Sequence, residues 1–359
     1  MKIAHFAPFA PVKAGIYEAA RDMVRADRAA GRDALFVDTG PVMGGVRSPR
    51  TENALDDRGG FTIKTASLEE AATADLIMAH DAPPQEFLAH TNMPMVWALH
   101  GRPLYCFRSE TSRQGQSYSN VRQIARWPRT KLLVTFWREH LPYWRVIVPT
   151  EKLRYTDDPV VDTLRFNPDG PVHEFVEGVG GQFNVLIADA WRSDVDMYEI
   201  AHGPLAAHDS IPGLKVHFYS VDGNGRPIPG GGAEPVLEPW GIIFDEYARL
   251  GIRGEVCSRV PNIEEVYRAC DVLLTPHRIA TRVMAEALSC GLAIIGGKGC
   301  RYTDYTCIPE DVTSIASVLL EVSKLSKSKR RGMALGASEA FRSKRFESRM
   351  QAIYEEAIA

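Results

Sequence analysis

The chain lacks any apolar run as long as the roughly 18–20 residues that a membrane-spanning helix needs. It also lacks a surplus of either charge, because 42 lysines and arginines are balanced by 45 aspartates and glutamates, for a net charge of −3. Bulk charge therefore gives no argument for a nucleic-acid or membrane partner, which leaves only a local basic patch to consider. The first residues show no signal-peptide pattern, so we expect a cytoplasmic protein, in the host cytoplasm if a bacteriophage encodes it.

Cysteine is scarce, and no two cysteines have the C-x-x-C spacing of zinc and redox sites. The six are Cys106, Cys257, Cys270, Cys290, Cys300 and Cys307. We expect reduced thiols, because nothing in their spacing indicates a disulfide framework. The G-x-x-x-x-G-K-[ST] phosphate loop, the G-x-S-x-G elbow and the H-E-x-x-H helix are also absent, which argues against kinases, serine hydrolases and zinc proteases.

The length of 359 residues predicts two domains of ordinary size. In the first part of the chain, short apolar runs alternate with amphipathic stretches, a pattern typical of an α/β domain with a parallel sheet covered by helices. The predicted strands of this part are residues 2–7, 34–38, 75–79, 95–99, 131–136 and 145–148. A stretch rich in proline and glycine, residues 155–181, then predicts a linker.

The second part repeats the alternation and predicts another doubly wound domain. Its predicted strands are residues 183–188, 215–219, 271–276 and 292–295, and its clearest helices are residues 263–270 and 281–290. Ser67 with Glu70 and Asn262 with Glu265 have capping-box spacing, and Gly291 predicts a helix end. We expect an N-terminal domain over residues 1–165, a second domain over 166–340 and a last helix, 341–359, that packs back on the first domain.

Two segments of the second domain carry a family likeness. Residues 260–276 (VPNIEEVYRACDVLLTP) and 286–295 (EALSCGLAII) resemble the donor-site half of GT-B glycosyltransferases of the group 1, family-4-like kind. The Gly15 loop, the strand that ends at His100 and the terminal run of residues 346–354 look like that family too. The resemblance implies a GT-B fold, two Rossmann-like domains facing a central cleft, and sugar transfer from a nucleotide-diphosphate sugar with retention of configuration.

The resemblance implies a donor site in the second domain. Glu286 would hold ribose hydroxyls, because a carboxylate can accept hydrogen bonds from two neighbouring hydroxyls. The diphosphate would meet the amides at the start of the helix that begins at Thr281, together with Arg192, Arg278 or Arg282. Arg278 stands eight positions before Glu286, where the family usually has a glutamate beside the transferred sugar.

Further residues follow from the same likeness. Val260 begins the first matching segment and belongs with the donor site, while Gly15 would let the first-domain loop approach the phosphates. His100 is the expected catalytic residue, a neutral imidazole that donates or accepts one hydrogen bond near the reacting centre. Asp81 ends a strand and would contact the acceptor. Each residue also has a plain structural interpretation, such as a turn residue or a satisfied buried histidine.

A run in the first domain interleaves basic and aromatic side chains. Its members are Arg122, Arg126, Arg129, Lys131, Arg138 and Arg145 with Trp127, Phe136, Trp137, Tyr143 and Trp144. Cations beside stacking surfaces suit an anionic acceptor that carries bases. One hypothesis is therefore transfer to a hydroxymethylated DNA base, flipped out of the duplex and held with the help of Arg126 and Arg138. The alternative is that the aromatics fill the core and the arginines are solvated.

We expect a UDP- or GDP-sugar as co-substrate and no metal, because the family is typically metal-independent. Other functions stay open: a glycosyltransferase with a carbohydrate or lipid acceptor, a nucleotide-sugar epimerase of the same fold, or a degenerate module that binds without catalysis. Arg278 in place of the family glutamate is the reason to keep the last of these. The sequence does not indicate the oligomeric state.

Overall fold

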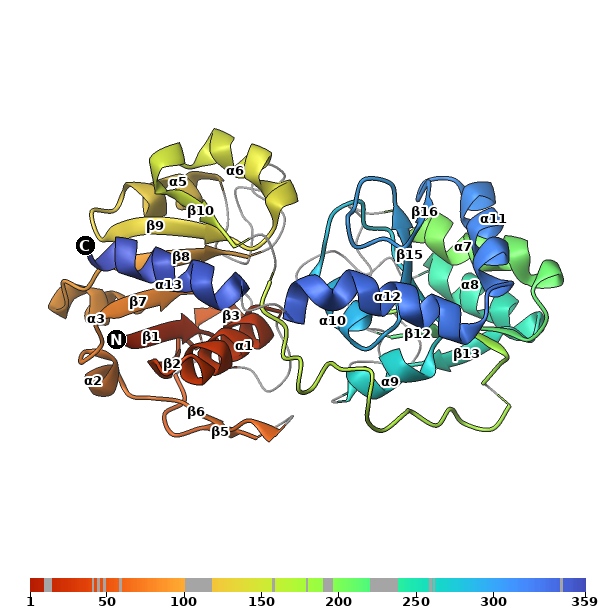
Figure 1. Cartoon of the computed structure of the whole chain (residues 1–359), viewed down its shortest axis with the longest axis horizontal. Coiled ribbons are helices and arrows are strands. Elements are labelled where there is room, and N and C mark those ends of the chain that lie inside the picture. Colours follow the sequence, from red (N-terminus) through yellow and green to blue (C-terminus); the bar gives the residue numbers. More distant parts are fainter. Residues whose placement is uncertain are drawn as a thin grey trace. The chain divides into compact units, whose positions relative to one another are not determined.

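The chain divides into two units in the computed structural model. Unit 1 is Met1–Asp162 with Ser343–Ala359, and unit 2 is Thr163–Arg342; the divisions expected from the sequence follow residues 165 and 340. The structure describes residues 1–9, 15–40, 42–43, 46–47, 50–57, 60–100, 118–156, 159–178, 180–189, 196–219, 238–257, 260, 262–342 and 345–359. Each unit is built around a sheet of its own (Figure 1).

Unit 1 contains a six-stranded parallel sheet. Its strands are β1 (Lys2–Ala7), β2 (Asp33–Asp38), β7 (Leu76–Ala79), β8 (Met95–Leu99), β9 (Thr130–Thr135) and β10 (Leu153–Tyr155). They lie in the order β10-β9-β8-β7-β1-β2, so the chain first extends the sheet from β1 to β2 and then continues on the other side of β1 with β7. The reversal between β1 and β7 marks the point where open α/β sheets bind ligands, at the carboxyl ends of the strands.

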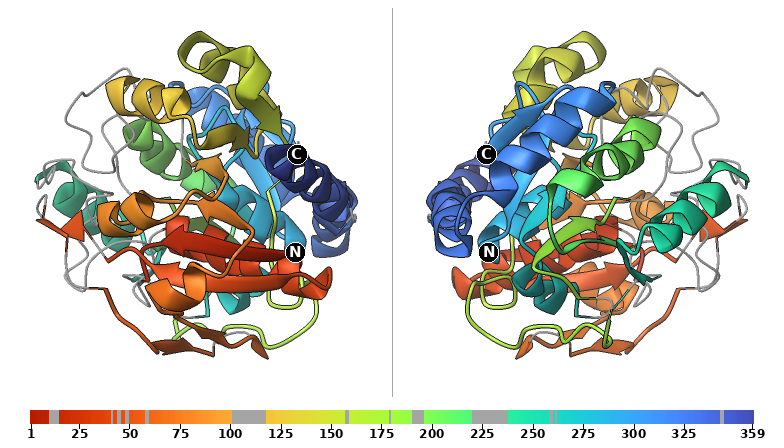
Figure 2. Two further views of the ribbon diagram at one scale, coloured as in Figure 1. Left: turned by 90° about the vertical axis from the view of Figure 1, so that its left-hand side faces the viewer. Right: turned by 90° about the vertical axis from the view of Figure 1, so that its right-hand side faces the viewer.

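Helices cover this sheet, and the last of them comes from the end of the chain. They are α1 (Gly15–Ala29), α2 (Leu68–Ala71), α3 (Gln85–His90), α5 (Tyr118–Arg126), α6 (Leu141–Ile147) and α13 (Arg345–Ile358). The last helix, α13, packs against β7, β8 and β9, beside the sheet formed by the beginning of the chain (Figures 1 and 2). Two small hairpins complete the unit, β3 (Val42–Met43) with β4 (Val46–Arg47) and β5 (Leu55–Asp56) with β6 (Ile63–Lys64).

The strand expected at residues 145–148 is wrong. These residues belong largely to helix α6, which runs from Leu141 to Ile147. Leu141, Trp144 and Ile147 recur at helical spacing and are all buried, so the helix covers the core of unit 1 with one face. The run of β-branched residues around Val146 looked like a strand, but the burial of one helical face decides the conformation.

Unit 2 repeats the architecture with a second six-stranded parallel sheet. The strands are β11 (Phe183–Ile187), β12 (Leu214–Phe218), β13 (Arg253–Val256), β14 (Val272–Leu274), β15 (Ala293–Gly297) and β16 (Tyr305–Cys307). Their order is β13-β12-β11-β14-β15-β16, which again places a reversal beside the first strand, between β11 and β14. The helices are α7 (Met197–Ala207), α8 (Glu238–Arg249), α9 (Ile263–Ala269), α10 (Arg282–Ser289), α11 (Val312–Ser323) and α12 (Lys327–Arg342).

The strands of unit 2 are apolar on both faces because helices cover both. Val185, Val216 and Val272 share one core with buried side chains of α7, α8 and α11. Alternate residues such as Leu186 and Leu273 are buried on the other face, where α10 packs against α9 and α12 (Figure 1). The predicted doubly wound α/β architecture is therefore confirmed for both units.

Of the two capping boxes predicted from the sequence, one is confirmed and one is wrong. Ser67 and Glu70 form the predicted capping box at α2, with both reciprocal hydrogen bonds present. The capping box expected from Asn262 is wrong: its side-chain amide donates to the Glu265 carboxylate at 3.1 Å and does not cap α9. Gly291 ends α10 with a φ of +81°, a conformation that favours glycine.

Candidate functional site

The reversal of strand order in unit 2 is lined by three buried polar side chains. Asp189 follows β11, and Thr275 and His277 follow β14, so all three lie at the carboxyl ends of neighbouring strands. The Thr275 hydroxyl donates to Asp189 Oδ2 at 2.6 Å, and His277 Nε2 lies 2.8 Å from Asp189 Oδ1. This network fixes the loop that leads from β14 toward α10.

The same loop lies closely over the end of β15. A Cβ on Gly297 would come within 2.5 Å of Arg278 Cγ, and one on Gly296 within 3.1 Å of Thr275 Cγ2. Only glycines allow the loop to approach the strand this closely. Arg278 is thereby held at the carboxyl edge of the sheet, where its guanidinium pairs with Glu310 and stays about half exposed. The hydrogen bond between them raises the pKa of Arg278 and lowers the pKa of Glu310.

Helix α10 begins at this edge and carries the main donor-site candidate. Thr281 is its N-cap and accepts a hydrogen bond from the Met284 amide at 3.4 Å, so the helix N-terminus faces the loop. Glu286 lies in the interior of α10 and is buried. Its Oε1 pairs with Arg282 Nε at 2.6 Å, and its Oε2 accepts from the Tyr267 hydroxyl at 3.4 Å. Four of the residues expected to bind the donor are thus brought onto one short segment.

The other expected donor residues stand apart. Arg192 lies outside the described residues. Val260 is partly buried and precedes α9, at the edge of the described part. Gly15 begins α1 in unit 1; neither its φ nor any described atom within 4 Å of an added Cβ requires a glycine there.

The carboxyl edge of the unit 1 sheet contains His100 and its neighbours. His100 follows β8, is nearly buried and stacks between His80 and Phe136, with ring centroids 5.1 and 5.4 Å away. His80 follows β7, next to Asp81, whose carboxylate accepts a hydrogen bond from the Thr39 hydroxyl at 3.0 Å. Both the catalytic candidate and one acceptor candidate therefore lie at the carboxyl edge of this sheet, as their positions after predicted strands indicated.

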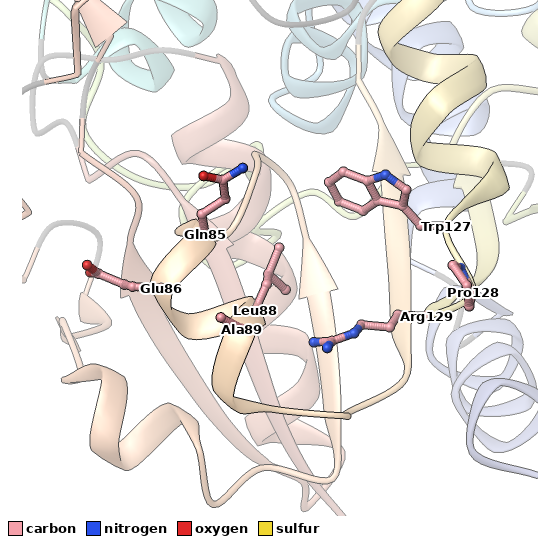
Figure 3. A pocket seen from close by; sticks show the side chains of 7 residues that line it. All are labelled: Gln85, Glu86, Leu88, Ala89, Trp127, Pro128 and Arg129. Carbon is pink, nitrogen blue, oxygen red and sulfur yellow. The ribbon is translucent and has the colours of Figure 1, made fainter.

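The two arginines expected at the acceptor lie at opposite edges. Arg138 follows β9 and is exposed at the same edge as His100. Arg126 ends α5, shortly before β9 begins, so it lies at the amino edge and is not brought near His100. A shallow hollow lies on that amino side, with Gln85 and Leu88 of α3 facing Trp127 (Figure 3). The hollow is lined by Trp127 and Arg129 of the basic and aromatic run, but by none of the residues expected at the catalytic centre or the donor site.

Burial also removes most of the expected stacking surface. Phe136, Trp137 and Trp144 are buried in unit 1, and Trp144 is among its core residues. Tyr143 is about half exposed and Trp127 is partly exposed. The interleaving of aromatic and basic residues in the sequence therefore reflects a helix and a strand that each present one face to the core. These aromatics do not form a platform for successive bases.

Several polar residues in or after the strands of the two sheets were not selected in the sequence analysis. Asp189 and His277 are partners across 88 positions of the chain, and His5 and His80 across 75. The position of each residue at or after a predicted strand was visible, and the rule that ligands bind at carboxyl ends could have selected them.

Among the described ranges, no group of three or more His, Cys, Asp or Glu is arranged to hold a metal ion. No described helix is long and apolar enough to cross a membrane.

Comparison with solved structures decides the fold. Sucrose-phosphate synthase from Thermosynechococcus elongatus is 14% identical over 99% of this chain and 98% of its own, with a TM-score of 0.62. Anabaena HepE in complex with UDP-glucose is 16% identical, over 99% and 98%, with a TM-score of 0.61. The trehalose-6-phosphate synthase OtsA is 10% identical, over 99% of both chains, with a TM-score of 0.65.

The chain has the GT-B fold. The agreement spans both units, since the matched structures cover nearly the whole chain. No protein-family model matches the sequence. No curated protein sequence matches it either. At identities of 10–16% the likeness establishes the GT-B architecture, and the residues at the two sheet edges must carry any argument about chemistry.

Proposed function

We propose that the protein is a glycosyltransferase that moves a sugar from a nucleotide-diphosphate sugar to an acceptor hydroxyl, with retention of configuration. The observation that carries the proposal is the segment from Arg278 to Glu286. It presents a buried carboxylate, two guanidinium groups and a helix N-terminus at the carboxyl edge of unit 2. A nucleotide sugar offers matching groups, namely ribose hydroxyls for the carboxylate and a diphosphate for the cations and amides.

The roles of the individual residues follow from their chemistry. Glu286 accepts hydrogen bonds from two ribose hydroxyls while Arg282, one turn earlier, keeps the carboxylate charged and oriented. Arg278 exchanges Glu310 for the diphosphate, and the α10 N-terminus adds its partial positive charge. The preference for a UDP-sugar is supported by HepE, solved with UDP-glucose, and by a similar structure from E. coli bound with UDP-2-fluoro glucose.

In the reaction, the bond between the anomeric carbon and the diphosphate oxygen breaks, and the acceptor oxygen bonds to that carbon. The acceptor proton leaves with the departing diphosphate, whose growing negative charge is stabilised by the guanidinium groups and the helix N-terminus. No step requires a metal ion. His100, Asp81 and Arg138 belong to the acceptor side in this proposal, because they share the carboxyl edge of unit 1. Arg126 is excluded from it by its place at the amino edge.

The acceptor class is the part of the proposal that the site supports least. Hydroxymethylated DNA keeps Arg138 as a phosphate contact but loses the stacking aromatics, which are in the core. A carbohydrate or lipid hydroxyl needs only the hydrogen-bonding groups at the His100 edge. We therefore propose a carbohydrate or lipid acceptor first and DNA second.

The proposal is tested by incubating the full chain with UDP-, GDP-, ADP- and CDP-sugars and measuring nucleoside diphosphate release. Separate reactions contain oligosaccharides, polyprenyl or glycolipid acceptors, DNA with 5-hydroxymethylated pyrimidines, or no acceptor. Release that depends on one acceptor class, with the sugar recovered on it in the donor's anomeric configuration by NMR, is the expected result. Epimerised donor without release would indicate an epimerase, and neither binding nor release would contradict the proposal.

A further inference from the structure

Three histidines in unit 1 form one continuous chain of hydrogen bonds that ends at His100. His5 Nε2 lies 2.8 Å from Asp27 Oδ2, and His5 Nδ1 lies 3.1 Å from His80 Nε2. His80 Nδ1 in turn lies 2.8 Å from His100 Nε2. This series of hydrogen bonds therefore extends from Asp27 in α1, through His5 in β1, to His80 and His100 at the ends of β7 and β8. Asp27, His5 and His80 are at most 2% exposed.

The carboxylate at one end fixes the direction of every hydrogen bond. Asp27 Oδ1 accepts from Arg32 at 2.9 Å, and Asp27 Oδ2 also accepts from the Tyr354 hydroxyl at 3.0 Å. A carboxylate can only accept hydrogen bonds, so His5 must donate through Nε2–H. A neutral imidazole carries only one N–H, so His5 Nδ1 must then accept from His80 Nε2–H.

The same step repeats once more toward His100. His80 uses its only proton toward His5, so its Nδ1 must accept from His100 Nε2–H. Burial, together with the neighbouring His100 and His5, holds the pKa of His80 well below its ordinary value, which keeps this middle ring neutral. His100 is thereby obliged to carry its proton on Nε2 and its lone pair on Nδ1.

We propose that Asp27, His5 and His80 are positioning residues that fix His100 as the Nε2–H tautomer, so that any hydrogen bond its Nδ1 makes, to the protein or to a hydroxyl of the sugar or acceptor, is one in which Nδ1 accepts. This catalytic consequence rests on the proposed function, whereas the tautomer itself does not. It decides between the two roles open to a neutral imidazole: His100 accepts and does not donate. A cluster that only filled the core would work equally well with its protons pointing the other way.

The substitution Asp27→Asn is expected to reverse the direction of every hydrogen bond from residue 27 to His100. The Arg32 Nε–H donates at the Oδ1 position and keeps the amide oxygen there, so the amide NH2 takes the Oδ2 position and donates to His5 Nε2. His5 must then donate through Nδ1–H to His80, and His80 through Nδ1–H to His100. His100 becomes the Nδ1–H tautomer and can no longer accept at Nδ1. The shape of the cluster is preserved.

Tyr354→Phe is the matched control. It removes the hydrogen bond that the buried Tyr354 hydroxyl donates to the same Asp27 oxygen. The carboxylate is kept, so the direction of the hydrogen bonds between the histidines is unchanged. Both variants change the hydrogen bonding at Asp27 Oδ2, but only Asp27→Asn changes the direction of the hydrogen bonds between the histidines.

The test is long-range ¹H–¹⁵N correlation spectroscopy of the ¹⁵N-histidine-labelled full chain, which distinguishes the two neutral tautomers of each ring. Resonances are assigned with His5→Gln, His80→Gln and His100→Gln. Nε2–H tautomers at all three positions are expected for the wild type and Tyr354→Phe, and Nδ1–H at His100 for Asp27→Asn. A charged or mixed ring, or an Nδ1–H tautomer at His100 in the wild type, overturns the proposal, and this arm needs neither a variant that folds well nor any activity.

The second arm measures turnover with the donor and acceptor identified for the wild type. Asp27→Asn is expected to lower kcat about 100-fold with KM for the nucleotide sugar within about twofold, whereas Tyr354→Phe keeps wild-type values. In the His100→Gln background, Asp27→Asn should have no further effect, because a glutamine amide can turn to present its oxygen. Wild-type kcat in Asp27→Asn despite a reversed tautomer contradicts a positioning role; an inactive wild type contradicts the proposed function, while the spectra still decide the tautomer.

Discussion

The carboxyl edges of the two sheets have the same topology but opposite electrostatic character. In unit 1 the edge carries imidazoles that are joined to Asp27 by one series of hydrogen bonds, from His5 through His80 to His100. In unit 2 the edge carries guanidinium groups already paired with carboxylates, Arg282 with Glu286 and Arg278 with Glu310. One edge is preorganised, whereas the other must exchange partners when an anion arrives.

This difference suits two separate tasks. A set of prearranged neutral dipoles orients a hydroxyl at little reorganisation cost, as catalysis requires. Cations that hold internal carboxylates suit the binding of a charged ligand, because the internal pairs keep the site ordered until the diphosphate replaces them. We therefore expect substitutions in unit 2 to change nucleotide affinity and substitutions in unit 1 to change turnover.

The largest expected effect is on nucleotide binding in unit 2. In the proposed donor site, Glu286→Gln removes the charge that would attract two ribose hydroxyls, and it also removes the ion pair with Arg282. Charge-assisted hydrogen bonds contribute about 1.5–3 kcal/mol each, so we expect a Kd for UDP-glucose roughly 10- to 100-fold weaker by calorimetry. The matched control is Glu264→Gln, a shielded glutamate paired with Arg165 at 3.0 Å in the same unit, which should leave Kd within about twofold. Equal effects of the two variants would contradict the assignment of Glu286.

A somewhat smaller effect is expected in unit 1. His100→Ala removes the acceptor of one hydrogen bond near the reacting atoms, which should lower kcat about 10- to 100-fold. The Kd of the nucleotide should stay within about twofold, because the proposed ribose and diphosphate contacts are in unit 2. Parallel calorimetry and steady-state kinetics provide the two values. If His100→Ala weakened binding as strongly as Glu286→Gln, the contrast between the two edges would be lost.

Unit 2 also contains one buried and one partly buried group, both outside the candidate site, that respond to pH in opposite ways. Burial lowers the pKa of His217 to about 4 and raises that of Asp304 to about 6. As pH falls from about 6.5 to 4, the unfolded state protonates His217 first, which costs the folded state about 3 kcal/mol. As pH falls from about 6 to 4, Asp304 is protonated in the folded state before it is protonated in the unfolded state. The folded state is thereby stabilised by a similar free energy.

In the wild type, the contributions of His217 and Asp304 to the pH dependence of the unfolding free energy offset each other. Substituting one residue at a time should separate the two contributions. Relative to the wild type, His217→Gln should become more stable as pH falls from 7 to 4, and Asp304→Asn should become less stable. Urea unfolding followed by circular dichroism at pH 7, 5.5 and 4 gives the comparison. Curves for the variants that run parallel to the wild-type curve would show that neither group has the expected shift.

The smallest expected effect concerns the exposed pair in unit 2. Glu310→Gln releases Arg278 from its carboxylate partner and should tighten nucleotide binding by about two- to fivefold, because the competing internal pair is lost. Arg278→Gln should weaken binding by a similar factor. Competition calorimetry with UDP resolves changes of this size. Weaker binding in Glu310→Gln would show that Glu310 itself contacts the donor.

Local signals predicted the framework of both edges. The N-cap Thr281, the apolar face of α10 and Gly291 each act over one or two turns, so the helix bearing Glu286 was visible in the sequence. The capping box at Ser67 was confirmed for the same reason. Where the prediction was wrong, at residues 145–148, a β-branched run competes with the helical spacing of Leu141 and Trp144, and only the packed core decides between them.

The networks inside each edge depend on contacts between distant parts of the chain. Asp189 meets His277, and Asp27 meets His5 and Tyr354, only after parallel strands and crossing helices bring them together. A sequence shows that such residues lie at strand ends but not which pairs have the right distance. Similarly, burial of Phe136, Trp137 and Trp144 follows from packing, so the stacking interpretation could not be judged before the fold was known.

The most direct test of the central claim is hydrogen exchange of the full chain with and without saturating UDP-glucose, followed by mass spectrometry of peptides. Binding at the carboxyl edge of unit 2 should protect peptides that cover residues 275–289 and leave those covering 85–90 and 127–129 unchanged. Protection confined to peptides outside residues 275–289, with that segment exchanging as in the free protein, would contradict the assignment of the donor site to this edge.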